Sequence, residues 1–219
     1  MVDVEPGPFL NPPLQARSRA AFERVLDAGT DVLREGGFEA FTITEVSRRA
    51  KVSIGSIYGR ANKEGLLLAI HARWAEGISL EQDALLRALD PGRMSADELV
   101  RAAVAAVAHV FREHGDLLHV FMIRGSLDAT IRERGAEASA RNAETFERLL
   151  LEHREAIAHE DPELAVDVAF RLVYSTLARR VMRGVAFESR RALSWQGLVD
   201  ELGEVCVRYL LRSELEAAF

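Results

Sequence analysis

The residues best suited to recognition chemistry stand together between Thr42 and Lys63. This stretch holds several hydroxyl groups, the side chains of Tyr58 and Arg60, and both lysines of the chain. A tyrosine hydroxyl and a lysine ammonium can donate to a phosphate, and an arginine can grip a guanine through two parallel hydrogen bonds. We therefore expect a surface that binds double-stranded DNA. The residues expected to contact DNA are Thr42, Thr44, Ser53, Ile54, Gly55, Ser56, Tyr58, Gly59, Arg60 and Lys63.

Two short helices joined by a tight turn would position these residues. Thr42 followed three positions later by Glu45 predicts a capping box, in which the Thr hydroxyl accepts the Glu45 amide and the Glu carboxylate reaches back to the Thr42 amide. Ser53 is expected to cap a second helix, and Asn62 a third. In the helix that precedes them, Gly29 predicts a close approach to the helix that begins after Thr42.

The spacing of apolar residues predicts which faces of these helices are buried. The inward positions are Ile43, Val46 and Ala50 on the first helix and Ile57 on the second. The outward positions of the second helix are Ser56, Tyr58 and Arg60. Two short helices, with small polar, aromatic and arginine side chains exposed on the second, are typical of a helix-turn-helix that reads the major groove.

The charge of the chain is divided between two parts. The net charge of the 219 residues is −6, which does not favour DNA binding by the chain as a whole. Residues 16–63, however, hold nine Lys or Arg against six acids, a net charge of +3, so the other residues carry −9. This asymmetry is the pattern expected when only one part of a chain meets phosphate.

Helical periodicity continues through the rest of the chain, and no strand-like alternation interrupts it. We expect further helices over about residues 18–34, 63–86, 95–113, 116–123, 129–158, 161–183 and 194–212. The predicted fold class is all-α, with an N-terminal three-helix helix-turn-helix domain on a C-terminal bundle of about six helices. The expected domains are a disordered arm (1–15), a DNA-binding domain (16–64) and a ligand-binding and dimerisation domain (65–219).

Residues 22–68 resemble the DNA-binding domain of the TetR (tetracycline-repressor-like) family of bacterial transcription regulators. The matching residues are Val25–Ala28, Gly36–Phe38, Thr42–Val46, Ala50–Ser53, Gly55–Tyr58 and Lys63–Leu67. The resemblance implies a homodimer that binds operator DNA, with a ligand pocket inside the larger domain.

Two departures from the family pattern bear on base reading. Family members commonly follow the Tyr of the second helix with a polar or aromatic pair and a Phe that locks the helix to the core. Here Tyr58 is followed by Gly59-Arg60-Ala61, one residue fewer, so the end of that helix is expected to be shorter or rotated. Lys51 stands where the turn usually has Gly, and we expect it either to avoid the left-handed region or to be mildly strained.

Two sets of residues in the larger domain follow from the resemblance. Apolar stripes such as those of the interface set are more often ordinary core, and core packing explains most of the pocket set equally well. The last two long helices would pair with their copies in a four-helix bundle. The residues assigned to that dimer interface are Val166, Phe170, Val173, Leu177, Leu198, Leu202, Val205 and Tyr209. The residues assigned to the ligand pocket are Phe111, Leu117, Leu118, Phe121, Met122, Phe170, Tyr174 and Met182.

The sequence offers no arrangement typical of catalysis or metal binding. Its six histidines form no Glu-x-x-His or His-x-x-x-His pair with a third ligand, and no Gly-rich phosphate loop is found. We therefore expect no enzyme, no cofactor and no metal. The single cysteine, Cys206, and the acidic, proline-rich start of the chain favour a soluble cytoplasmic protein without a membrane segment.

The leading interpretation is a homodimeric transcriptional repressor that is released from a palindromic operator by a small, largely apolar effector. Two alternatives stay open. One is a helix-turn-helix regulator without a small-molecule effector, which a partner protein controls or which acts constitutively. The other is a helical-bundle carrier or enzyme with a vestigial DNA-binding head.

Overall fold

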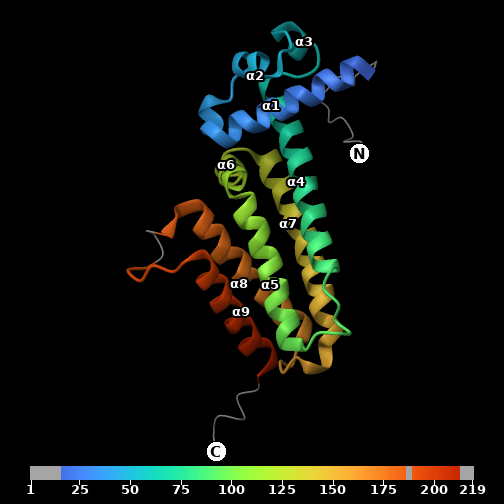
Figure 1. Cartoon of the computed structure of the whole chain (residues 1–219), viewed down its shortest axis with the longest axis vertical. Coiled ribbons are helices and arrows are strands. Elements are labelled where there is room, and N and C mark those ends of the chain that lie inside the picture. The colour runs from blue at the N-terminus through green and yellow to red at the C-terminus, as the bar shows by residue number, and fades with distance from the viewer. Residues whose placement is uncertain (1–15, 186–188, 213–219) are drawn as a thin grey trace, which may run out of the picture. The chain divides into compact units, whose positions relative to one another are not determined.

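The structure, a computed structural model, describes residues 16–185 and 189–212, and all of its regular elements there are helices (Figure 1). The α-helices are α1 (Ala16–Ala40), α2 (Ile43–Ala50), α3 (Ile54–Tyr58), α4 (Lys63–Arg87), α5 (Ala96–Glu113), α6 (Gly115–Gly125), α7 (Ala129–Leu150), α8 (Pro162–Arg183) and α9 (Trp195–Leu211). A short 3-10 helix, η1 (Leu151–Ala156), follows α7. The predicted all-α fold is confirmed, and the predicted arm 1–15 lies outside the described residues.

The chain folds into two compact units, each made of two separate segments. The first unit comprises residues up to Gly77 together with Asp116–Gly135, and the second comprises Ile78–Gly115 together with the residues from Ala136 onward. Helices α4 and α7 each begin in the first unit and end in the second. The domain limits expected from the sequence, residues 16–64 and 65–219, stay predictions.

Side-chain caps set the start of most helices where the sequence predicts them. Ser95 and Glu98 form a complete capping box before α5. The carboxylate of Asp161 accepts the Leu164 amide before α8, and the Ser194 hydroxyl accepts the Gly197 amide before α9. The clearest difference lies in α7, which ends at Leu150 and is followed by η1, whereas one helix was expected over 129–158. In α1 the helical backbone is interrupted at Gly37, where φ is 64° and ψ is −165°, a few residues past the predicted end.

The core of the first unit joins α1, α2 and α3 to the start of α4 and to α6. Its fully buried members include Leu33, Phe41, Val46, Leu66 and Ile70. The expectation that Gly29 approaches the helix after Thr42 is wrong. A Cβ at Gly29 would lie 2.5 Å from Ile70 Cδ1 of α4 and 3.2 Å from Phe41 Cε2, so the close neighbours come from α4 and from the residue before Thr42.

The core of the second unit is built around α5, α8 and α9, which lie side by side (Figure 1). Arg101 of α5 forms an ion pair with Glu204 of α9 at 2.5 Å. A Cβ at Gly203 would lie 3.4 Å from the Arg101 side chain, so the two helices approach closely there. Helix α4 contributes Leu86, which is fully buried.

Candidate nucleic-acid interface

The caps of α2 and α3 form as predicted. The Thr42 hydroxyl accepts the Glu45 amide at 3.2 Å, and the Ser53 hydroxyl accepts the Ser56 amide at 3.2 Å. Asn62 caps α4 by accepting the Gly65 amide at 2.7 Å. Each bond satisfies a helix-end amide that would otherwise lack a partner, and this fixes where each helix begins.

The turn between α2 and α3 is tight and left-handed. Lys51 has φ 54° and ψ 43°, so it adopts the left-handed conformation that non-glycine residues rarely adopt. Three bonds hold the turn: the amides of Lys51 and Val52 donate to the Ser47 carbonyl, that of Val52 at 3.3 Å, and the Ser47 hydroxyl donates to the Val52 carbonyl at 2.6 Å. The expectation that Lys51 avoids the left-handed region is therefore wrong. The other expectation, a mildly strained Lys51, agrees with these angles.

One face of α3 is buried and the other is open. Ile57 is buried in the core of the first unit, whereas Ile54 is 41% exposed and Tyr58 is 58% exposed. A Cβ at Gly55 would meet no atom within 4 Å, so packing inside the protein does not require glycine there. The predicted residues that are exposed are Thr42, Thr44, Ser53, Ile54, Gly55, Ser56, Tyr58 and Gly59.

Two predicted contact residues turn toward aromatic rings instead of solvent. The expectation that Arg60 points outward is wrong, because its guanidinium lies 5.3 Å from the centre of the Phe22 ring. Lys63 is half-buried, and its Nζ lies 4.5 Å from the centre of the Phe38 ring. The guanidinium of Arg124 lies 4.4 Å from the same ring. Cation–π attraction therefore holds the side chains of Arg60 and Lys63 against aromatic rings of the first unit.

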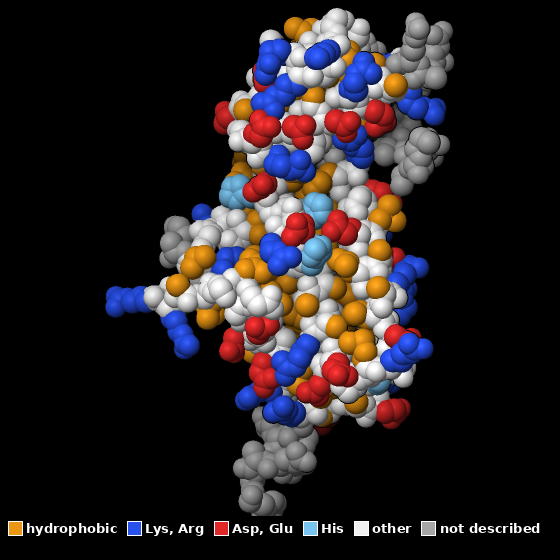
Figure 2. Space-filling view, viewed as in Figure 1, with side chains coloured by type: hydrophobic (Ala, Val, Ile, Leu, Met, Phe, Trp, Pro, Cys, Tyr) orange, Lys and Arg blue, Asp and Glu red, His pale blue; other side chains and the backbone are white. Residues whose placement is uncertain are grey.

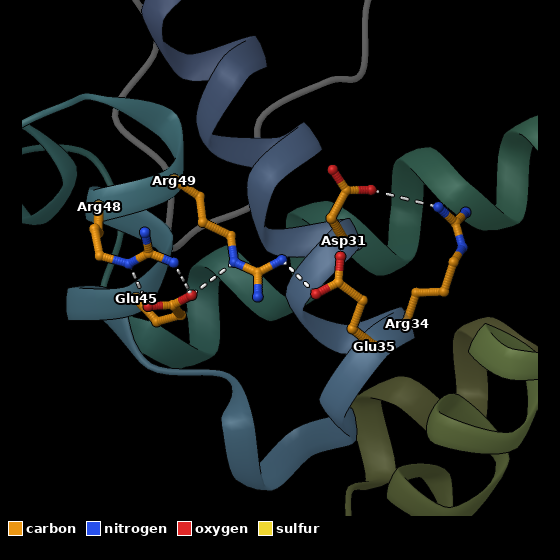
Figure 3. A network of polar contacts seen from close by, with 6 residues as sticks. All are labelled: Asp31, Arg34, Glu35, Glu45, Arg48 and Arg49. Atoms are coloured by element: carbon orange, nitrogen blue, oxygen red, sulfur yellow. Dashed lines mark hydrogen bonds and ion pairs between the residues drawn. The ribbon is translucent and has the colours of Figure 1, made fainter.

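An ion-pair network that the sequence analysis missed joins α1 to α2 (Figure 3). Glu45 accepts two hydrogen bonds from Arg48, at 2.8 and 2.7 Å, and one from Arg49 at 2.7 Å. Arg49 also donates to Glu35 of α1 at 2.7 Å. The second half of the predicted Thr42–Glu45 capping box is therefore wrong, since the Glu45 carboxylate binds guanidinium groups and not the cap amide. The spacing of Glu45 to Arg48 and Arg49, three and four residues, is a signal that could have predicted these pairs.

The network has an electrostatic consequence. Hydrogen bonds from Arg48 and Arg49 lower the pKa of Glu45 to about 2. The bond to Glu45 in turn raises the pKa of Arg48, and bonds to Glu45 and Glu35 raise that of Arg49. Figure 2 shows Lys and Arg side chains near α2 and α3 of the first unit, with a row of acidic side chains beside them. Part of the positive charge of this unit is thus neutralised internally.

The residues predicted for a ligand pocket are divided between the two units. Leu117 and Phe121 are buried in the core of the first unit, and Leu118 and Met122 are half-buried there. In the second unit the ring centres of Phe111 and Tyr174 lie 5.2 Å apart, and those of Phe170 and Tyr174 lie 5.8 Å apart. Met182 is half-buried in the second unit. The pocket stays a prediction.

Within a single chain, most residues predicted for the dimer interface are core residues of the second unit. Burial is nearly complete at Val166, Phe170, Val173, Leu177, Leu198 and Leu202. Val205 is 49% exposed, and Tyr209 is half-buried. These six residues have almost no surface left for contact with a second chain. Of the predicted interface residues, only Val205 and Tyr209 have exposed surface in the single chain.

Neither a metal-binding group nor a membrane-spanning helix is found in the part of the chain that the structure describes. There, no group of three or more His, Cys, Asp and Glu side chains is arranged to hold a metal ion. The helices of residues 16–185 and 189–212 include none that is long and apolar enough to cross a membrane.

Two family models match the chain. The first describes bacterial regulatory proteins of the tetR family and covers residues 25–70. The second describes the C-terminal domain of tetracyclin repressor-like proteins and covers residues 95–210, more than half of the chain. The chain belongs to the TetR family. It is therefore a transcriptional regulator, and α2 and α3 are the helix-turn-helix of its DNA-binding domain.

One curated relative of this TetR-family regulator is the A-factor receptor protein of Streptomyces griseus. The two are 32% identical over 94 residues, which are 42% of this chain and 34% of the relative, so the chain spans about a third of the length of that protein. The matched region is therefore smaller than either protein.

Solved structures of other transcriptional regulators share the fold. A bacterial regulatory protein in the tetR family from Rhodococcus RHA1 gives a TM-score of 0.63 at 18% identity, with 90% of this chain and 99% of that chain covered. The transcriptional regulator FadR from Bacillus subtilis, solved in complex with stearoyl-CoA, gives a TM-score of 0.61 at 16% identity, with 85% and 97% covered. At these identities the likeness shows the fold alone.

Proposed function

We propose that this TetR-family regulator is a homodimeric repressor that binds a palindromic operator and leaves it when a small, largely apolar effector binds. The observation that carries the proposal is the exposed face of α3, with Ile54, Ser56 and Tyr58 open to solvent while Ile57 anchors the helix. A short helix anchored on one face and open on the other fits the major groove of B-DNA.

Phosphate contacts would supply most of the affinity for DNA. The Tyr58 hydroxyl is exposed, and the amides at the start of α2 lie beside the exposed hydroxyls of Thr42 and Thr44. Helix starts and hydroxyl groups bind phosphate oxygens and set the register of a protein on the duplex. Sequence choice is left to the side chains of α3.

The outer faces of α8 and α9 support the dimer. Leu164 and Leu172 of α8 and Val205 of α9 are large apolar residues that stay exposed in the single chain. Burial of such residues against a second copy would remove apolar surface from water. A two-fold symmetric dimer would present two copies of α3 to a two-fold symmetric operator.

The aromatic cluster inside the second unit supports an effector of apolar character. Phe111, Phe170 and Tyr174 are joined by the ring contacts described above, and the ring centre of Phe146 lies 5.5 Å from that of Phe170. FadR, which shares the fold, is a regulator with stearoyl-CoA bound, and the A-factor receptor protein is a receptor by name. An effector that binds the DNA-free form more tightly would release the operator by mass action.

Selection of bound fragments from genomic DNA tests this function. The purified full-length chain is expected to enrich a palindromic site, and apolar or acyl compounds that raise its melting temperature are expected to release the labelled site. Random DNA of the same length is the control. Equal binding to the enriched and the random fragments would refute the proposal that the chain binds a specific operator. If none of the compounds that raise the melting temperature releases the site, the proposed effector control is refuted. That result would favour a regulator without a small-molecule effector.

A further inference from the structure

Arg60 leaves the reading face of α3 and packs against α1. Helix α3 ends at Tyr58, and the chain turns there because the amides of Arg60 and Ala61 both donate to the Ile57 carbonyl at 2.9 Å. The turn buries the Ala61 side chain and carries the Arg60 guanidinium to 5.3 Å from the centre of the Phe22 ring. The arginine therefore connects the end of α3 to the first turns of α1.

The surroundings of the guanidinium are those of a packed group. It borders a groove of about 310 Å³ between α1 and the α2–α3 segment, which is also lined by Phe22, Val25, Val52 and Ile57. Nη1 of Arg60 is buried and has no hydrogen-bond partner among the described residues. An arginine that reads guanine needs its planar fork free to donate two parallel bonds to the base. With Nη1 buried and the guanidinium against a ring, Arg60 cannot offer the Nη1–Nη2 edge of that fork to a base.

We propose that Arg60 is a positioning residue, which holds the end of α3 on α1 through Phe22 and does not read bases. The proposal rests on the proposed function, because it assigns the contacts of the same DNA-reading surface. Bases are then read by Ile54 and Ser56. Isoleucine offers an apolar surface that suits the methyl group of thymine, and serine can bond to the edge of several bases. The operator contacts of α3 are therefore specified by a thymine methyl group and not by an arginine–guanine pair.

Variants of the full-length chain separate positioning from reading. Arg60→Met keeps a long side chain without its charge, and Phe22→Leu removes the ring from α1, away from the reading face. Without DNA, each is expected to lower the melting temperature by about 2–4 °C, and the double variant by no more than the larger single effect. As a control, Arg34→Met removes an exposed arginine of α1 and is expected to change the melting temperature little.

Binding to the selected operator and to its single base-pair variants supplies the second readout. Arg60→Met and Phe22→Leu are expected to weaken binding to all of these sites by one common factor, so that the preference at each position stays unchanged. Loss of preference at one G·C pair in Arg60→Met but not in Phe22→Leu would overturn the proposal, as would additive changes in melting temperature. A wild-type chain that selects no DNA would refute the proposed function, while the melting temperatures would still decide the Arg60–Phe22 contact.

Discussion

His71 lies uncharged inside the first unit at neutral pH. Its side chain is 2% exposed, and its ring centre lies 4.7 Å from that of Phe121. Burial, aided by the positive charge of Arg134, lowers the pKa of His71 to about 4. An imidazole in the unfolded chain takes up its proton near pH 6.5. The unfolded chain therefore binds more protons than the folded chain between these two values, and the stability falls as the pH falls through that window.

This burial predicts the acid sensitivity of the fold. Between about pH 7 and pH 4, His71 is expected to remove up to about 3 kcal/mol from the free energy of unfolding. The variant His71→Met fills similar space without a titrating group, so its stability should fall less over the same range. Urea unfolding at several pH values measures the difference. Identical pH profiles for the wild type and the variant would contradict this account of His71.

At the scale of the helix, Gly29 and Gly77 form a matched pair. A Cβ at Gly29 of α1 would lie 2.5 Å from Ile70 Cδ1, whereas a Cβ at Gly77 of α4 would meet nothing within 4 Å. Gly29→Ala is therefore expected to destabilise the fold by about 1–3 kcal/mol through overpacking. Gly77→Ala is expected to stabilise it by up to about 1 kcal/mol, because alanine favours the helix. Denaturant unfolding measures both changes, and effects of the same sign would contradict the packing described for Gly29.

The network between α1 and α2 limits the charge that the helix-turn-helix offers to DNA. In Glu45→Gln, Arg48 loses its carboxylate and Arg49 keeps only Glu35. The variant is expected to bind random DNA more tightly, and the slope of log affinity against log salt concentration should steepen by about 1. Fluorescence anisotropy at several salt concentrations measures the slope. Asp31→Asn, which frees Arg34 of α1, is the matched control for a gain of one net positive charge. Equal slopes for the two variants would contradict a role specific to the network.

Contacts between residues close together in the sequence could be predicted, and contacts between distant residues could not. The caps at Thr42, Ser53 and Asn62 could be predicted, because each is satisfied by an amide three residues away. The orientation of Arg60 could not, because Phe22 on another helix determines it. The neighbour of Gly29 was wrongly predicted for the same reason, since Ile70 lies 41 positions further along the printed sequence. Secondary structure and family could thus be predicted from short sequence patterns, whereas the orientation of individual side chains could not.

At the scale of the whole molecule, the exposed apolar residues of α8 and α9 predict how two copies associate. Leu172→Glu and Val205→Glu place a charge at residues that are 44% and 49% exposed. A charge buried in an interface without a partner is strongly unfavourable, so each variant is expected to be monomeric at concentrations where the wild type is dimeric. Sedimentation velocity measures the mass of each species. Leu80→Glu, at a residue of α4 that is 50% exposed, is the control and should leave the dimer intact. A wild-type monomer, or dimers in all variants, would contradict the proposed interface.

The central claim is that the exposed face of α3 binds DNA, and affinity for the selected operator tests it most directly. Tyr58→Phe removes one exposed hydroxyl and leaves Ile57 anchored in the core. It is expected to weaken operator binding by about tenfold or more, because a hydrogen bond to a phosphate is lost. Thr30→Val removes a hydroxyl of the same unit that bonds to the Leu26 carbonyl, and it should leave the affinity unchanged. Equal affinities of wild type, Tyr58→Phe and Thr30→Val, measured by fluorescence anisotropy in the same salt, would contradict the claim.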